Sequence, residues 1–214
     1  MEKMNKRKVF KVVGWLVAVG ISAMLSGMLT GCGGVNIRWK EEVRMVDGEM
    51  LLVDRTGKGR KYCEPGRPCG WFPSEMSVQV VKLPANWAPP PVWLKEYAPI
   101  LLDYQPQERA WNVIATFVDC DGWERLGYPD LPYIQYQSKN GEPWEIILLE
   151  ERLIGRKTNL LTGPKHKGEP RLVTAEERDR RNNRAARYFQ SIVAVWKENG
   201  CSKPRGKQDS LGGK

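Results

Sequence analysis

The sequence predicts an α+β fold, in which a β-rich antiparallel sheet built from hairpins is packed by one long C-terminal amphipathic helix. Three observations predict it: alternating apolar and polar residues around Asp47-Gly48, a similar stretch around Asn140-Gly141, and a helical apolar stripe near the C-terminus. Alternation with a period of two is typical of a half-buried strand, and both dipeptides suit tight hairpin turns. We therefore expect hairpins to form most of the sheet.

The first predicted hairpin is the segment "NIRWKEEVRMVDGEMLLVDR", residues 36–55. Its apolar residues alternate with charged ones, and the apolar set is Ile37, Trp39, Val43 and Met45. Glu41 breaks this pattern, because it places a carboxylate on the apolar face. We interpret Glu41 as a strand end or a bulge rather than as a site residue.

The second predicted hairpin is "PYIQYQSKNGEPWEIILLE", residues 132–150. Both faces of its return strand, 144–149, are largely apolar, so we expect that strand to be central or sandwiched. Two further strands are predicted in "SVQVVKL" and "RAWNVIATFVDC". The proline-rich "PANWAPPPVWLKEYAP" that links them favours an extended, polyproline-like path.

The predicted helix follows Thr174, which forms a capping box with Glu177. Asn199-Gly200 supplies a C-terminal stop. Apolar residues at steps of three and four between these points form one stripe, which we expect to pack on the sheet. Its members are Ala185, Tyr188, Phe189, Ile192, Val193 and Trp196.

The N-terminus has the pattern of an export signal. Five basic residues and one acid occupy residues 1–11, and no ionisable side chain follows from Val12 to Gly31. A basic segment before an apolar one is typical of a secretory signal. The length of the apolar run also permits an uncleaved transmembrane helix.

The tetrapeptide Leu29-Thr30-Gly31-Cys32 resembles the lipobox of bacterial lipoproteins. This resemblance implies a signal peptide at 1–31, a lipidated Cys32 with a tether at 32–35, and stable anchoring through several acyl chains. Gly33 is not the aspartate of an inner-membrane retention signal, so the resemblance favours the outer membrane, facing the periplasm. Residues 36–201 are then expected to form a single domain, and the polar residues 202–214 a disordered tail.

Four further cysteines predict two disulfides, because an oxidising compartment favours them. Cys63 and Cys69 bracket two prolines and a glycine, so we expect them to close a small loop. This leaves Cys120 to pair with Cys201. Zinc is the less favoured interpretation, since the spacing is not C-x2-C and His166 is the only histidine.

The net charge and the lack of catalytic motifs exclude several classes of function. The whole chain carries 34 basic and 25 acidic residues, and loss of residues 1–31 leaves 29 against 24. This mild excess argues against nucleic acid as a partner and for membrane lipid, envelope proteins or cell-wall polymer. His166 has no neighbouring nucleophile, and no phosphate-binding glycine motif is present, so we expect no cofactor and no bound metal.

Two groups of residues are candidates for ligand contact. Trp87, Trp93 and Trp123 lie in proline-rich or glycine-rich sequence, where they could stack on sugars or proline-rich partners, although packing at the core edge is the favoured interpretation. The acids of "VDCDGWERLGYPDLP" could bind calcium or hydrolyse a glycan, although a solvated loop is favoured. The acidic candidates are Asp119, Asp121 and Glu124.

The segments "WKEEVRMVDG" and "PYIQYQSKNGEPWEIILLEE" resemble parts of uncharacterised proteobacterial lipoproteins. This resemblance implies an envelope location and a β-rich fold, and it implies no activity. The sequence therefore predicts an outer-membrane lipoprotein that acts as a binding or assembly module without catalysis. The alternatives are a carboxylate-based glycan hydrolase of the cell wall and an exclusion lipoprotein of a mobile element.

Overall fold

A computed structural model describes residues 34–62, 70–117, 120–162 and 171–196. The chain divides into two units, Met1–Gly34 and Val35–Lys214, and the elements described below belong to the second. The predicted signal peptide, Cys32 and residues 202–214 lie outside the described residues. Within the described ranges, no helix has the length and apolarity that crossing a membrane requires.

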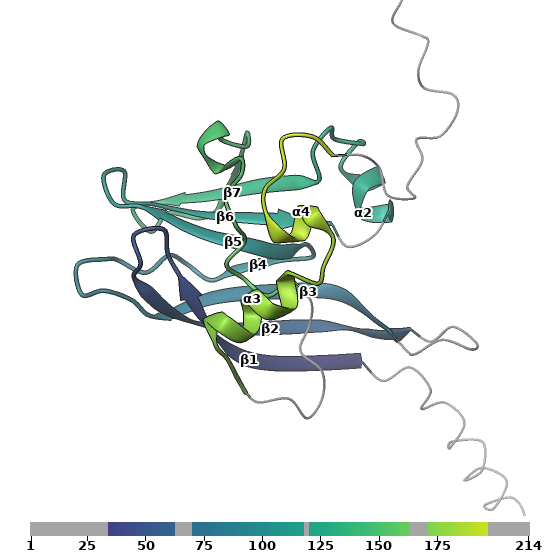
Figure 1. Cartoon of the computed structure of the whole chain (residues 1–214), viewed down its shortest axis with the longest axis horizontal. Helices are drawn as coiled ribbons and strands as arrows, with labels where there is room; N and C mark the ends of the chain where they lie inside the picture. Colours follow the sequence, from purple (N-terminus) through teal and green to yellow (C-terminus); the bar gives the residue numbers. More distant parts are fainter. Residues whose placement is uncertain (1–33, 63–69, 118–119, 163–170, 197–214) are drawn as a thin grey trace, which may run out of the picture. The chain divides into compact units, whose positions relative to one another are not determined.

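Two sheets make up the fold of the described residues (Figure 1). In the five-stranded sheet the order is β4-β3-β2-β1-β9, and in the four-stranded sheet it is β5-β6-β7-β8. Strand β9 pairs in parallel with β1, whereas β2–β3, β3–β4 and the three pairs of the four-stranded sheet are antiparallel. The strands are β1 (Gly34–Arg44), β2 (Met50–Tyr62), β3 (Gly70–Lys82), β4 (Trp93–Lys95), β5 (Ala98–Gln105), β6 (Ala110–Thr116), β7 (Tyr133–Lys139), β8 (Glu145–Ile147) and β9 (Leu172–Val173). The predicted sheet-rich fold of antiparallel hairpins is thus confirmed.

The two sheets pack face to face and enclose the main core. Alternation along β1 behaves as the sequence predicts, since Trp39 and Val43 are buried whereas Arg38 and Lys40 are exposed. Every strand of both sheets except β8 contributes to this core. Its buried members include Trp39, Val43, Leu51, Val53, Met76, Val78, Trp93, Leu102, Trp111, Val113, Tyr136 and Val173. At about 25 cal/mol per Å² of apolar surface, this burial is the main stabilising contribution.

The four-stranded sheet is also covered on its outer face. Ile100, Ile114 and Tyr133 point away from the main core and pack with Leu153 and Ile192 in a second cluster. The sheet is therefore buried on both sides, and β5 and β6 accordingly consist almost entirely of buried residues. The outer face of the five-stranded sheet, by contrast, is exposed, with Arg38 and Lys40 of β1 beside scattered apolar residues such as Val81 and Leu94.

Residues 153–162, which we call the strap, join the two sheets along one side of the sandwich. The backbone N–H groups of Asn159 and Leu160 donate to the carbonyl of Ile100 in β5, and that of Leu161 donates to the Glu41 carboxylate in β1. The Asn159 side chain donates to the carbonyls of Leu102 and of Arg44, which belong to different sheets. The strap is therefore held by buried polar bonds to both sheets.

The proline-rich segment between β3 and β4 packs against residues at the ends of β5 and β6 and just before β8. Its carbonyl oxygens have no strand partner, and two indole N–H groups bind them: Trp111 donates to Ala88 and Trp144 to Pro91, both at 2.9 Å. The Trp87 ring lies 4.4 Å from that of Tyr104 and packs against the core. Tryptophans thus anchor an extended segment that lacks backbone pairing.

Strand β8 differs from its prediction. It is an edge strand rather than a central one, and the side chains of Ile146 and Leu148 are 68% and 92% exposed. Ile146 lies opposite Tyr136, so both point towards the five-stranded sheet. Tyr136 packs on Trp93 of β4, which is the last strand of that sheet, and nothing in the described part of the chain covers Ile146 beyond it.

The long C-terminal helix is the largest error of the sequence prediction. Thr174 does cap a helix, and its hydroxyl accepts from the N–H of Glu177, but α3 (Ala175–Asn182) ends after two turns. A second short helix, α4 (Arg187–Gln190), follows. Beyond it the chain is extended and bonds to the strap, because Ile192 N donates to Arg156 O and Gly155 N to Ile192 O.

The break comes directly after Asn182, which is bound to the strap. Its side-chain amide donates to the carbonyl of Leu160 at 2.8 Å, and its oxygen accepts from Thr162 in the strap. Tyr188, Phe189 and Val193 still pack on the outer face of the four-stranded sheet, as their apolar character demands. Of the predicted apolar stripe, Ile192 is buried and the other members are half-buried, and no continuous helix presents them.

Glu41 is neither at a strand end nor in a bulge. It lies within β1 with its side chain in the main core, where its Oε2 accepts from Nη1 of Arg55 at 2.9 Å. Both side chains are completely buried. The exception in the hydrophobic pattern therefore marks a buried ion pair.

Candidate functional site

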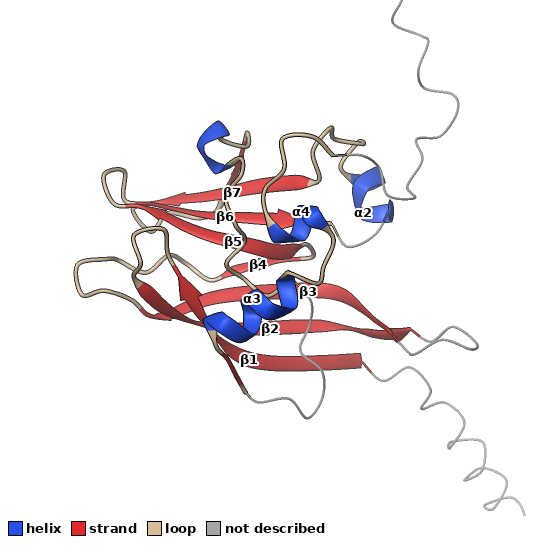
Figure 2. Cartoon of the chain, viewed as in Figure 1, coloured by secondary structure: helices blue, strands red, loops and turns tan. Residues whose placement is uncertain are grey.

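The acidic segment after β6 forms a short helix, α2 (Cys120–Arg125), rather than the predicted solvated loop. Gly127 and Tyr128 end it with φ angles of 75° and 61°. Their N–H groups donate to the carbonyls of Glu124 and Trp123, which is the bonding pattern of a Schellman motif. Figure 2 shows α2 at one end of the four-stranded sheet.

An aromatic cluster fixes α2 in place. Trp123 is 1% exposed, and its indole N–H donates to Pro129 O at 3.1 Å. Its ring packs edge-on against Tyr128 and Trp196, and Trp196 packs in turn against Phe117. The side chains that α2 exposes are therefore held on a rigid support.

Cys120, the first residue of α2, is disulfide-bonded. The other cysteines of the predicted bridges, Cys63, Cys69 and Cys201, lie outside the described residues, as does Cys32. The predicted pairing of these cysteines and the lipidation of Cys32 therefore stay predictions.

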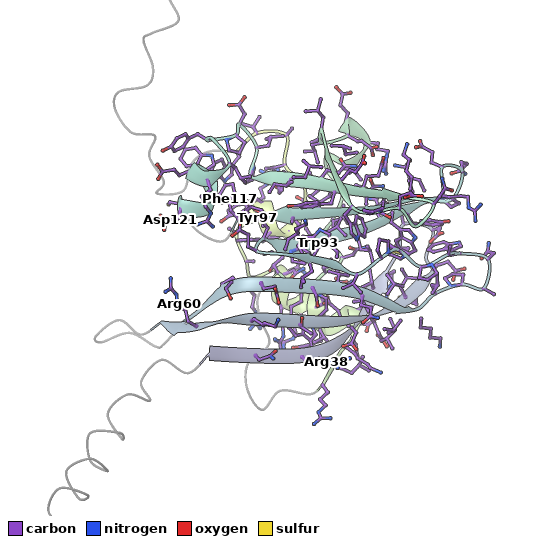
Figure 3. All side chains as sticks on the ribbon, turned by 180° about the vertical axis from the view of Figure 1, so that it is seen from behind. Arg38, Arg60, Trp93, Tyr97, Phe117 and Asp121 are labelled. Carbon is purple, nitrogen blue, oxygen red and sulfur yellow. The ribbon has the colours of Figure 1, made fainter. Side chains whose placement is uncertain are left out.

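A pocket of about 440 Å³, which we call the α2 pocket, lies beside this helix. Four separate segments line it: α2, the turn between β4 and β5, the residue after β6, and the paired ends of β2 and β3. Figure 3 shows Tyr97, Phe117 and Asp121 at one end of the sandwich, with Arg60 on the five-stranded sheet at the same end. The residues with functional side chains are Arg60, Ser74, Glu96, Tyr97, Phe117, Asp121 and Arg125.

The charges of the α2 pocket are balanced. Two arginines face two carboxylates, and Arg125 Nη2 lies 4.0 Å from Glu96 Oε2. Burial raises the pKa of Tyr97, and the adjacent Glu96 raises it further, whereas Arg125 lowers it. The phenol therefore stays protonated at neutral pH and keeps both a donor and an acceptor for hydrogen bonding.

The predicted acidic residues are divided by this arrangement. Asp121 lines the α2 pocket, whereas Glu124 is exposed outside its lining and lies beside Tyr128. Burial, followed by the hydrogen bond with Glu124, raises the pKa of Tyr128. Asp119 lies outside the described residues.

The three candidate tryptophans pack in the fold, as the favoured interpretation of the sequence has it. Trp93 is completely buried between the sheets and lies 5.5 Å from the ring of Tyr136. Trp123 supports α2, and Trp87 packs on Tyr104 and Trp111. Neither Trp93 nor Trp123 has exposed ring surface on which a ligand could stack.

Sequence reasoning missed Glu96, Tyr97 and Arg60. No sequence signal brings the β4–β5 turn or the end of β2 to α2, because the register of two separate sheets decides it. Phe117 is the exception, since it directly follows β6 and its place near α2 follows from chain connectivity.

The described residues contain no group of three or more His, Cys, Asp and Glu side chains that could hold a metal ion. No protein-family model, no curated protein and no solved structure matches the chain. The function is therefore inferred from the geometry of the described residues.

Proposed function

We propose that the chain is a lipoprotein, anchored in the outer membrane through an acylated Cys32, whose periplasmic domain binds cell-wall glycan without catalysis. The observation that carries the binding proposal is the α2 pocket. It combines the half-buried Tyr97 ring with two carboxylates and two arginines over the buried Phe117, and these residues come from segments distant in sequence.

This set of side chains suits a polyhydroxylated ligand that carries both acidic and basic groups, as cell-wall glycan with its peptides does. Carboxylates accept hydrogen bonds from sugar hydroxyls, and arginines bind carboxylates in a bidentate way. An aromatic ring supplies apolar contact for the C–H face of a sugar. The rigid support of α2 reduces the ordering cost of binding.

Binding fits the two carboxylates better than hydrolysis does. A glycosidase needs a carboxylic acid kept protonated by burial beside a second carboxylate. Asp121 and Glu96 are both exposed, so neither has the buried position that such an acid requires. Hydrolysis remains the second candidate because these two acids line one pocket.

The test is cosedimentation of the detergent-solubilised full chain with purified cell-wall sacculi. We expect the wild type to sediment with them and the double variant Glu96→Gln/Asp121→Asn to bind about tenfold more weakly, since it loses charge-assisted hydrogen bonds. Glu108→Gln is the matched control, because Glu108 is an exposed acid that pairs with Lys139 outside the pocket.

Analysis of the supernatant distinguishes the two candidates. Soluble glycan fragments released by the wild type and not by the double variant would identify a hydrolase. Equal sedimentation of the wild type, the double variant and Glu108→Gln would refute a role for the α2 pocket.

The anchoring has its own test, which is the intact mass of the protein from membranes of its host. A mass that begins at Cys32 and includes acyl groups is expected. A mass that retains Met1 with an unmodified Cys32 would refute the lipoprotein assignment and leave glycan binding to be judged separately.

A further inference from the structure

A second pocket, of about 430 Å³, lies where the strap meets α3, and we call it the strap pocket. Its lining comes from the end of β1 with the following turn, from the strap, from the second half of α3 and from Gln190 of α4. It shares no lining residue with the α2 pocket. The proposed glycan site therefore does not account for it.

Buried hydrogen bonds hold the walls of the strap pocket. Arg178 is 2% exposed and donates from Nη1 to the carbonyl of Glu42 at 2.7 Å and from Nη2 to Asp179 at 2.8 Å. Asn182, 4% exposed, binds the carbonyl of Leu160. The pocket is therefore formed before any ligand arrives.

The lining is predominantly basic. Arg44, Arg156, Lys157 and Arg178 line it, whereas Asp179 is its one acidic residue. This distinguishes the strap pocket from the α2 pocket, where two arginines face two carboxylates.

The side chains of Lys157 and Asn183 are the donors most readily available to a ligand. Those of Arg178, Asn182 and Gln190 already donate to other groups of the protein. Within the described ranges, no hydrogen bond or ion pair engages the side chain of Lys157 or of Asn183. Arg44 pairs with Glu176 on the exposed surface, with 50% and 73% of the two side chains accessible, and such a pair contributes little and exchanges readily. Arg156 shares the buried carboxylate of Asp103 with Arg152.

We propose that the strap pocket binds a phosphate group, either free or carried by a lipid headgroup. A phosphate presents several charged oxygens to donors that converge from different directions. The Lys157 ammonium, the Asn183 amide and the Arg44 guanidinium match this, and they come from the strap, the end of α3 and the end of β1. The carbonyl end of α3 is the negative pole of the helix dipole and by itself disfavours an anion. Bonds from the N–H groups of residues 183, 184 and 185 to the carbonyls of Asp179, Arg181 and Asn182 reduce this effect, and four basic side chains line the same pocket.

The test is isothermal titration calorimetry on the full chain in a maltoside detergent. Inorganic phosphate is one probe. The other is dihexanoyl phosphatidylglycerol, used below its micelle-forming concentration. We expect saturable binding that weakens as salt concentration rises. Lys157→Gln should weaken it about tenfold, the effect of losing one charged donor. Lys139→Gln removes the same charge from an exposed residue outside the pocket and should leave binding unchanged.

Each outcome decides the proposal. Binding of inorganic phosphate that depends on Lys157 supports a free anion, and binding of the lipid alone with the same dependence supports a headgroup. Absence of binding by both probes, or equal effects of Lys157→Gln and Lys139→Gln, would overturn the proposal. Lys157→Gln is expected to fold normally, because the exposed Lys157 side chain makes no described bond. Denaturant unfolding that matches the wild type verifies this.

Discussion

At the scale of single residues, Tyr133 shows how a polar atom holds an irregular segment in place. Its ring packs in the second cluster, and its hydroxyl lies 3.1 Å from Tyr188 O and 3.2 Å from Ser191 O. The same hydroxyl accepts from the N–H of Val193 at 3.0 Å. One side chain of β7 thus satisfies backbone groups of a segment that has no regular helix or strand to do so.

Tyr133→Phe removes these bonds and leaves the ring. We expect the free energy of unfolding to fall by about 1–2 kcal/mol, because the N–H of Val193 loses its acceptor. Urea unfolding at neutral pH measures this. Tyr104→Phe is the control, since it alters a core tyrosine for whose hydroxyl no hydrogen bond is described.

The same tyrosine predicts a pH dependence. Burial raises the pKa of Tyr133 from 10.0 to about 12. The Tyr133 phenol loses its proton from about pH 10 in the unfolded chain and only near pH 12 in the folded chain. The contribution of the protonated Tyr133 to stability is therefore complete below pH 10 and is lost as the pH rises from 10 to 12. Tyr133→Phe lacks this loss, so the stability difference between it and the wild type should narrow from pH 9 to pH 11. A constant difference would contradict the prediction.

At the scale of elements, local sequence patterns predicted the strands and hairpins well. They failed where contacts between residues distant in sequence determine the structure. The Asp47-Gly48 and Asn140-Gly141 turns and the Thr174 cap were predictable because their signals lie within a few residues of sequence. The end of α3 was not predictable, since Asn182 bonds to Leu160 some twenty residues away. Part of the α2 pocket was unpredictable for the same reason. Glu96 and Asp121 line one pocket only because tertiary packing brings their segments together.

Strand β8 offers a direct test of the difference between the predicted and observed positions. The sequence predicts a central strand, in which Ile146→Lys would cost several kcal/mol. On the observed edge, where Ile146 is 68% exposed, we expect a change within about 0.5 kcal/mol in denaturant unfolding. Ile114→Lys is the contrast, because Ile114 of β6 is completely buried and its substitution should prevent stable folding.

At the scale of the whole molecule, the pair of Glu41 and Arg55 connects the parts of the sandwich. The Glu41 carboxylate accepts from Arg55 of β2, Trp39 of β1 and Leu161 of the strap. Burial raises the pKa of Glu41, and the charge of Arg55 opposes that effect. Arg55 donates in turn to the carbonyl of Ser77 in β3, and its guanidinium carbon lies 5.1 Å from the Trp39 ring centroid.

We expect this ion pair to specify the register of β1 against β2 more than it adds to the net free energy of unfolding. Two charges lose their hydration in the core, and their attraction together with the surrounding hydrogen bonds only offsets that cost. A wrong register of β1 against β2, or a displaced strap, would leave a buried charge without its partner. The exception in the alternation of β1 therefore specifies which strands and which strap residues meet.

A double-mutant cycle tests this interpretation. Arg55→Met and Glu41→Leu should each lower the free energy of unfolding by about 3–5 kcal/mol, because each leaves the other charge buried and unpaired. The double variant should lose less than either single variant, since both charges are gone. What it forfeits are the hydrogen bonds from the Trp39 indole and the N–H of Leu161 to Glu41, and the bond from Arg55 to the carbonyl of Ser77. Urea unfolding of the four proteins measures the coupling. Additive losses in the double variant would show instead that the two residues act independently of each other.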